Sequence, residues 1–111
     1  MTFEEEKKLS DDFESLRIKY GDIFDVELVA FLVSDKEVFS VETLNERQFY
    51  FYDKNGKEIN IACGKDWMYI EDEYLYILDN YWIVDSEYSY GVTKYRINKD
   101  SLAKIKMILT I

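Results

Sequence analysis

The spacing of apolar residues predicts a helix near the N-terminus. The residues that recur at intervals of three and four, and so share one helical face, are Leu9, Phe13, Leu16 and Tyr20. Thr2 and Glu5 have the spacing of a capping box. Gly21 stands where a residue of positive φ commonly ends a helix. We therefore expect a helix over residues 3–19.

Apolar runs and alternating patterns predict a series of short strands after this helix. The run Val26–Val33 is apolar on both faces apart from Glu27, as expected of a strand that is covered on each side or lies centrally in a sheet. In Arg47–Asp53 phenylalanine alternates with tyrosine, and the pair Asn55-Gly56 that follows predicts a type I′ hairpin turn. The remaining expected strands are Glu37–Thr43, Glu58–Cys63, Trp67–Ile70, Glu73–Leu78, Tyr81–Asp85 and Val92–Ile97, with turns at Glu71-Asp72 and Asp79-Asn80.

A second helix is predicted at the C-terminal end, where either Asn98 or Asp100 can act as its cap. Its apolar face would be formed by Leu102, Ile105 and Leu109. Helices at the two ends of a series of strands indicate an α+β fold, here a mainly antiparallel, strongly bent sheet of about six to eight short strands between an N-terminal and a C-terminal helix. This architecture is similar to a pleckstrin-homology-like barrel. With no repeat or linker to divide it, the chain is expected to form one domain over residues 1–111.

The charge of the chain limits the partners that it can bind. Its 23 acidic and 14 basic residues give a net charge of −9, which disfavours nucleic acids and anionic membranes as direct ligands and favours a protein with a basic surface. The sequence has neither a signal-peptide pattern nor a long apolar run, and its single cysteine, Cys63, fits a reducing compartment. We therefore expect a cytoplasmic protein.

The residue types needed for common catalytic chemistry are sparse. The chain has no histidine, which removes the commonest general base and metal ligand, and its four glycines form no phosphate-binding loop. The acidic run Glu71-Asp72-Glu73 does not have the ligand spacing of a calcium-binding EF-hand. We therefore predict no enzyme activity, no cofactor and no metal site. A small enzyme that uses two carboxylates remains an alternative.

The most informative feature is an acidic, aromatic stretch that contains no lysine or arginine between Lys65 and Lys94. Tyrosine and tryptophan surrounded by carboxylates form a suitable protein-binding surface, because the rings give rigid contact area and the charges attract a basic partner. The predicted anchors are Trp67, Tyr74, Tyr76 and Trp82, and the predicted charged rim is Glu71, Asp72, Glu73, Asp79 and Asp85. The alternative is that these tyrosines fill half-buried positions of strands.

These features predict a small acidic inhibitor that covers a basic or nucleic-acid-binding surface of a target protein such as a nuclease, with carboxylates in place of phosphate charges. In gross character the chain resembles toxin-immunity proteins and phage anti-defence proteins, including inhibitors of CRISPR nucleases. The alternative from another class is a pleckstrin-homology-like adaptor that binds a peptide at the edge of its sheet.

Overall fold

Two β-sheets and two α-helices make up residues 13–44 and 47–109, which are the residues that the computed structural model describes. The predicted α+β class with mostly antiparallel strands is confirmed, whereas the single bent sheet is wrong, because the seven described strands form two sheets. In chain order the elements are α2 (Phe13–Phe24), β1 (Leu28–Val38), β2 (Ser40–Leu44), β3 (Gln48–Tyr52), β4 (Glu58–Ala62), the 3-10 turn η1 (Lys65–Trp67), β5 (Met68–Glu71), β6 (Tyr74–Val84), β7 (Glu87–Ile97) and α3 (Lys99–Leu109).

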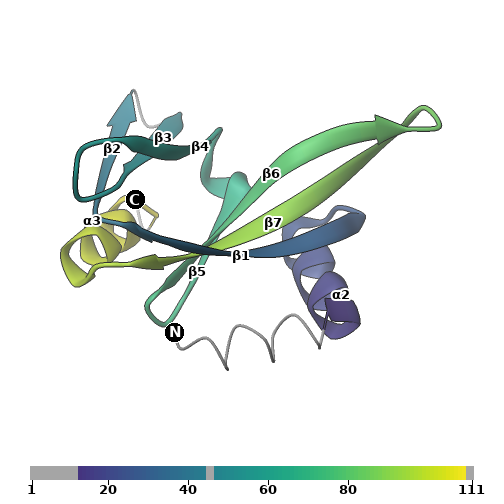
Figure 1. Ribbon diagram of the computed structural model, residues 1–111, viewed down its shortest axis with the longest axis horizontal. Helices are drawn as coiled ribbons and strands as arrows, with labels where there is room; N and C mark the ends of the chain where they lie inside the picture. Colours follow the sequence, from purple (N-terminus) through teal and green to yellow (C-terminus); the bar gives the residue numbers. More distant parts are fainter. Residues whose placement is uncertain (1–12, 45–46, 110–111) are drawn as a thin grey trace.

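The larger sheet, sheet A, has the strand order β1-β7-β6-β5, and the smaller one, sheet B, has the order β2-β3-β4 (Figure 1). All neighbouring strands are antiparallel except β1 and β7, which are parallel. The apolar run predicted as a central strand lies in β1 at the edge of sheet A. Leu28 and Phe31 of this strand are buried, while Val29 and Leu32 are exposed. The prediction of a central strand, or of one covered on each side, is therefore wrong.

Helix α2 has the predicted apolar face but a different end. Leu16 and Tyr20 are buried, whereas Thr2, Glu5 and Leu9 lie outside the described residues. The helix does not stop at Gly21 but continues to Phe24. A Cβ atom on Gly21 would lie 3.0 Å from the carbonyl oxygen of Val26, so this glycine permits a close approach of the chain that enters β1.

The expected turn at Asp79-Asn80 is also wrong, because both residues lie inside β6, which is 11 residues long. Its register with β7 shifts between Asp79 and Trp82, which accommodates the two polar residues inside the strand. The chain turns instead at Asp85 and Ser86, whose φ angles of 50° and 68° suit a two-residue hairpin. Strand β7 correspondingly begins at Glu87 and not at Val92.

The hairpin between β3 and β4 is present, but its turn is not of type I′. Gly56 has a φ of 78°, while Asn55 is not among the described residues of positive φ. The carboxylate of Asp53 accepts the backbone N–H groups of Asn55 and Lys57, both at 2.9 Å. This side-chain contact favours a type I turn that is followed by a glycine bulge.

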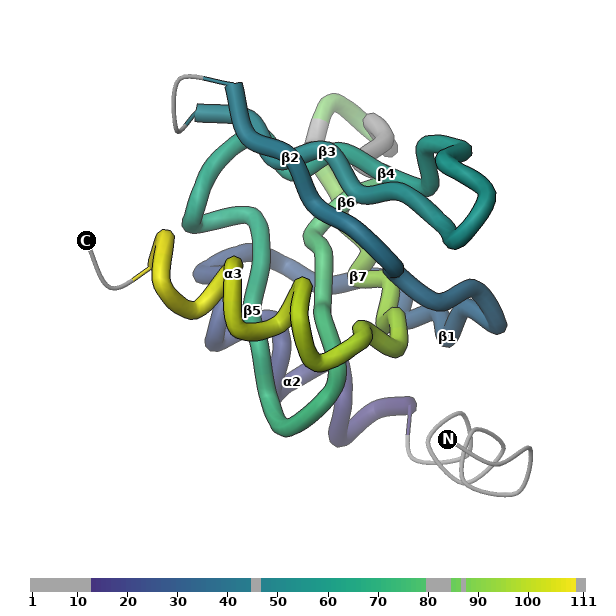
Figure 2. Tube along the Cα trace, turned by 90° about the vertical axis from the view of Figure 1, so that its left-hand side faces the viewer, coloured from purple at the N-terminus to yellow at the C-terminus, as the bar shows by residue number. Residues whose placement is uncertain are grey.

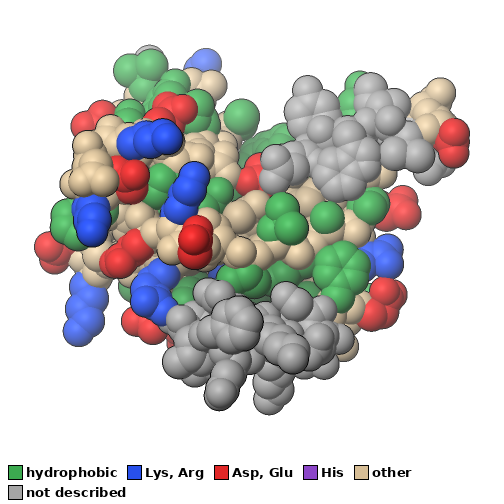
Figure 3. Space-filling view, viewed as in Figure 1, with side chains coloured by type: hydrophobic (Ala, Val, Ile, Leu, Met, Phe, Trp, Pro, Cys, Tyr) green, Lys and Arg blue, Asp and Glu red, His purple; other side chains and the backbone are tan. Residues whose placement is uncertain are grey.

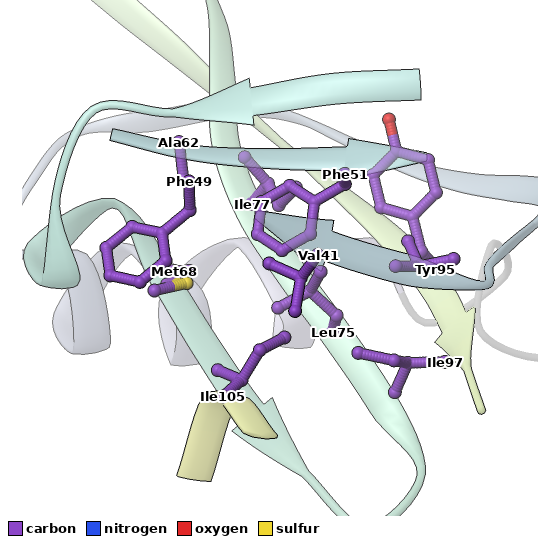
Figure 4. Packing of buried hydrophobic residues seen from close by; sticks show 11 residues of the cluster. Val41, Phe49, Phe51, Ala62, Met68, Leu75, Ile77, Tyr95, Ile97 and Ile105 are labelled. Atoms are coloured by element: carbon purple, nitrogen blue, oxygen red, sulfur yellow. The ribbon is translucent and has the colours of Figure 1, made fainter. Parts of the chain in front are cut away.

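One core lies between sheet A, sheet B and α3. Leu75 and Ile77 of β6 face Phe49 and Phe51 of β3, and Ile105 of α3 closes the end of the cluster (Figure 4). Figure 2 shows sheet B as a separate layer above sheet A, with α3 beside both. Leu102 and Leu109 pack against the same cluster, so the predicted apolar face of this helix is confirmed.

A second core lies on the opposite face of sheet A, which α2 covers. Tyr76 and Leu78 alternate with the residues of the first core along β6 and pack with Tyr20, Phe31 and Val92. Their burial means that the inner half of β6 is enclosed on both sides.

The first turn of α3 is hydrogen-bonded to the segment that connects sheet A with sheet B. The Asn98 carboxamide accepts the N–H of Ser101 at 2.8 Å, which makes Asn98, and not Asp100, the cap of the helix. The Asn98 amide nitrogen and the Ser101 hydroxyl donate to the carbonyl of Phe39, at 2.6 and 2.8 Å. Phe39 lies between β1 and β2, so these bonds fix the two sheets to each other.

Truncation of Ile105 tests the docking of α3. This side chain is fully buried, so Ile105→Ala should lower the free energy of unfolding by about 2–5 kcal/mol, through lost burial and the cavity left behind. Exposed Lys106→Ala on the same helix should change it by about 0.5 kcal/mol or less. Urea unfolding followed by tryptophan fluorescence measures both, and equal effects of the two changes would contradict this packing.

Candidate protein-binding surface

The predicted acidic rim does not form one continuous surface. Asp72 and Glu73 form the turn between β5 and β6, whereas Asp85 lies in the turn between β6 and β7. The 11 residues of β6 separate the two turns by about 35 Å of extended strand. The predicted residues are therefore divided between these two turns, the end of β5, the length of β6 and η1.

Glu71 forms a structural contact between α2 and sheet A. Its carboxylate accepts hydrogen bonds from the Lys19 ammonium at 3.2 and 3.3 Å and from the Tyr69 hydroxyl at 2.8 Å. The Tyr69 hydrogen bond and then the bond from Lys19 hold the pKa of Glu71 below its ordinary value. The charge of Glu71 is thus partly used within the protein.

The tyrosines in the inner half of β6 pack against the protein itself. Tyr76 is 4% exposed and stacks on the Tyr20 ring with 4.7 Å between centroids, and burial raises the pKa of its hydroxyl. Tyr74 is half-buried beneath the ammonium of Lys94, which lies 3.9 Å from its ring centroid. Tyr76 is therefore part of the core and does not belong to a binding surface.

Trp67 and Asp79 support the inner part of the β6–β7 hairpin. The half-buried Trp67 ring packs edge-on against Tyr90 at 6.1 Å between centroids. The Asp79 carboxylate accepts hydrogen bonds from the Asn60 amide at 2.6 Å and the Thr93 hydroxyl at 3.1 Å. These bonds connect β4, β6 and β7 at one point.

Beyond this point β6 and β7 continue as a two-stranded projection, residues 80–89, which we call the arm (Figure 1). Strand β5 pairs with β6 only from Tyr74 to Ile77, and β1 pairs with β7 only from Tyr90 onward. Within residues 13–44 and 47–109, no strand pairs with the outer edge of either arm strand. Among the described residues, both edges of the arm therefore lack a neighbouring strand.

The described side chains of the arm include exposed aromatic and acidic groups. Tyr88 is 59% exposed, and Asp85 at the turn is exposed as well. The backbone of Trp82 pairs with Ser89, but its side chain lies outside the described residues. Figure 3 shows an acidic side chain at the tip of the arm, while most basic side chains in this view lie over sheet B and α3.

Sheet B carries a second tyrosine-rich surface, whose residues were not among the predicted binding residues. Tyr50 and Tyr52 are half-buried on its outer face, opposite Glu42 and Glu58 in the neighbouring strands. Burial and then the charges of Glu42 and Glu58 raise the pKa of Tyr52. The alternation of phenylalanine and tyrosine in β3 was the sequence signal for this face.

Neither a metal-binding cluster nor a membrane-spanning helix is found in the described part of the chain. No group of three or more aspartate, glutamate, cysteine or histidine side chains there is arranged to hold a metal ion. No helix formed by these residues has the length and apolarity to cross a bilayer. Comparison with models of known families, with curated proteins and with solved structures finds no match to this chain.

The contact between Glu71 and Lys19 predicts a pH-dependent contribution to stability. Because the pKa of Glu71 is lower in the folded protein, its ionised form stabilises the fold at neutral pH, and this contribution is lost as the pH falls through the folded-state pKa. Glu71→Gln should lower the free energy of unfolding by about 0.5 kcal/mol at pH 7, because the pair is partly exposed.

The difference between Glu71→Gln and the unchanged protein should shrink as the pH falls and vanish below the folded-state pKa of Glu71, where both side chains are neutral. Urea unfolding at several pH values measures it. Glu73→Gln, at the exposed position two residues further along the chain, is the control and should change the free energy of unfolding little. A deficit of Glu71→Gln that stays constant down to low pH would show that its charge is not responsible.

Proposed function

We propose that this chain is a small non-catalytic inhibitor that acts in the cytoplasm and inserts the arm into a basic groove of a target protein. The groove would be one that the target uses to bind nucleic acid, as in a nuclease. The observation that supports this proposal is the projection of residues 80–89 beyond the strands beside them. Asp85 and Glu87 give this projection its negative charge, because no lysine or arginine lies between Lys65 and Lys94 to offset them.

The open edges of the arm support a binding role. A two-stranded hairpin by itself is at best marginally stable in water, because it has no hydrophobic face that another layer covers. A groove in a partner would cover both faces, and strands of the partner could pair with the open backbone edges. Exposed Tyr88 adds contact area for such an interface.

The charge of the arm supports a basic partner. Carboxylates on a narrow projection can enter a groove that is shaped for a phosphate backbone and can replace its charges. Attraction of this kind speeds association, and salt weakens it. The target surface would therefore be rich in lysine and arginine.

Strand β1 favours a second candidate, an adaptor that binds a peptide by strand addition. It lies at the edge of sheet A, with Val29 and Leu32 37% and 52% exposed. A peptide paired with this edge would gain main-chain hydrogen bonds and apolar contacts. Binding of this kind would depend little on salt and would not require the arm.

Charge reversal at the two ends of β6 distinguishes the contribution of the arm to binding from that of the other acidic residues. Asp85 and Asp72 are exposed hairpin residues with φ angles of 50° and 56°, so lysine introduces a similar backbone cost and the same charge change at each. Asp85→Lys should slow association with the target by about tenfold at low salt, and Asp72→Lys should have a much smaller effect.

The target for these measurements is obtained by capture from lysate of the source organism on the immobilised protein, with elution by increasing salt. A variant in which Asn-Gly replaces residues 81–89 should retain the fold and lose the salt-sensitive partner. Surface plasmon resonance then compares Asp85→Lys with Asp72→Lys. Equal association rates, or full binding by the shortened variant, would reject the arm as the binding element and favour the β1 edge.

A further inference from the structure

A cavity of about 490 Å³ lies between the end of α2 and the segment that contains η1 and the start of β5. Its apolar lining includes Ile23, the buried Met68 and the half-buried ring of Tyr69. Two exposed carboxylates, Asp25 and Asp66, lie on the same lining. The cavity thus combines an apolar wall with negative charge.

The end of α2 adds further negative potential to this cavity. The N–H of Val26 donates to the carbonyl of Gly21 at 3.0 Å, and the N–H of Asp25 donates to that of Asp22 at 3.3 Å. Together with the φ of 52° at Asp25, these bonds form a Schellman motif. The two hydrogen bonds of this motif go to the carbonyls of Gly21 and Asp22 and not to the last two carbonyls of the helix, those of Ile23 and Phe24. These last carbonyls lie at the negative end of the helix dipole.

We propose that this cavity receives an arginine side chain of the target protein, an inference that rests on the basic partner of the proposed function and adds a second contact to it. The aliphatic part of the arginine would pack on Ile23 and Met68. Its planar guanidinium has five N–H donors for the carboxylates and the helix-end carbonyls, and it can stack on the Tyr69 ring. Among the described residues of the lining, Lys65 is the single cation, and the two carboxylates outnumber it.

A small probe tests this inference without the target. The probe is arginine with an acetylated N-terminus and an amidated C-terminus, titrated into the ¹⁵N-labelled protein and followed by NMR. The matched probe is the same compound made from citrulline, which has nearly the same shape but no charge. We expect the arginine compound to shift the amide signals of Asp25, Asp66 and Tyr69 together, and the citrulline compound to shift them little.

Two matched variants locate the binding charge. Asparagine tolerates positive φ, so Asp25→Asn should remove the charge and keep the Schellman motif. It should weaken binding of the arginine probe by about tenfold, because a charge-assisted hydrogen bond is lost. Asp22→Asn is the control, since Asp22 is also exposed near the end of α2 but does not line this cavity.

The outcomes separate this inference from the proposed function. Shifts spread over all acidic regions, equal shifts with citrulline, no shifts, or equal weakening by Asp22→Asn would overturn the arginine site. The variant with Asn-Gly in place of residues 81–89 should still bind the probe, because the cavity lies outside the arm. If that variant loses the target while Asp25→Asn binds it normally, the arm proposal stands and the arginine site does not contribute.

Discussion

The pairing of β6 with β7 is the interaction on which the rest of this structure depends. Both strands are 11 residues long, and they lie at the centre of sheet A. Their inner halves carry residues of both cores, because neighbouring side chains of β6 face opposite layers. Their outer halves extend past the ends of β1 and β5. The same hairpin therefore organises the fold and forms the projecting arm.

The boundary between these two halves is held by polar contacts. Asp79 binds Asn60 and Thr93, and Asn60 also donates to the Tyr95 hydroxyl at 2.9 Å. Burial raises the pKa of the Tyr95 hydroxyl, because it disfavours the charged form, so this hydroxyl remains a neutral hydrogen-bonding group. The network gives the arm a fixed base, which reduces the entropy lost when the arm enters a partner.

The sequence pattern predicts local structure well where one rule acts alone. The alternation in β3 and the apolar face of α2 follow from the side-chain period, and Asn98 is one of the two caps that the sequence allowed for α3. Prediction failed where contacts between residues distant in sequence determine the local structure. Gly21 permits the approach of Val26, and the register shift keeps Asp79 inside a strand. Strand β1 lies at an edge because it pairs in parallel with β7. Two contacts of the predicted site residues could not be predicted, because their partners come from other elements. Glu71 binds Lys19 of α2, and Tyr74 lies against Lys94 of β7.

Hydrogen–deuterium exchange of the protein, alone and bound to its captured target, tests the central claim most directly. Alone, the backbone amides of residues 80–89 should exchange faster than those of residues 74–78, because only the latter are enclosed by two layers. In the complex, exchange should slow mainly at residues 80–89. Protection confined to the Asp72-Glu73 turn, to sheet B or to the β1 edge, with an unchanged arm, would contradict the claim.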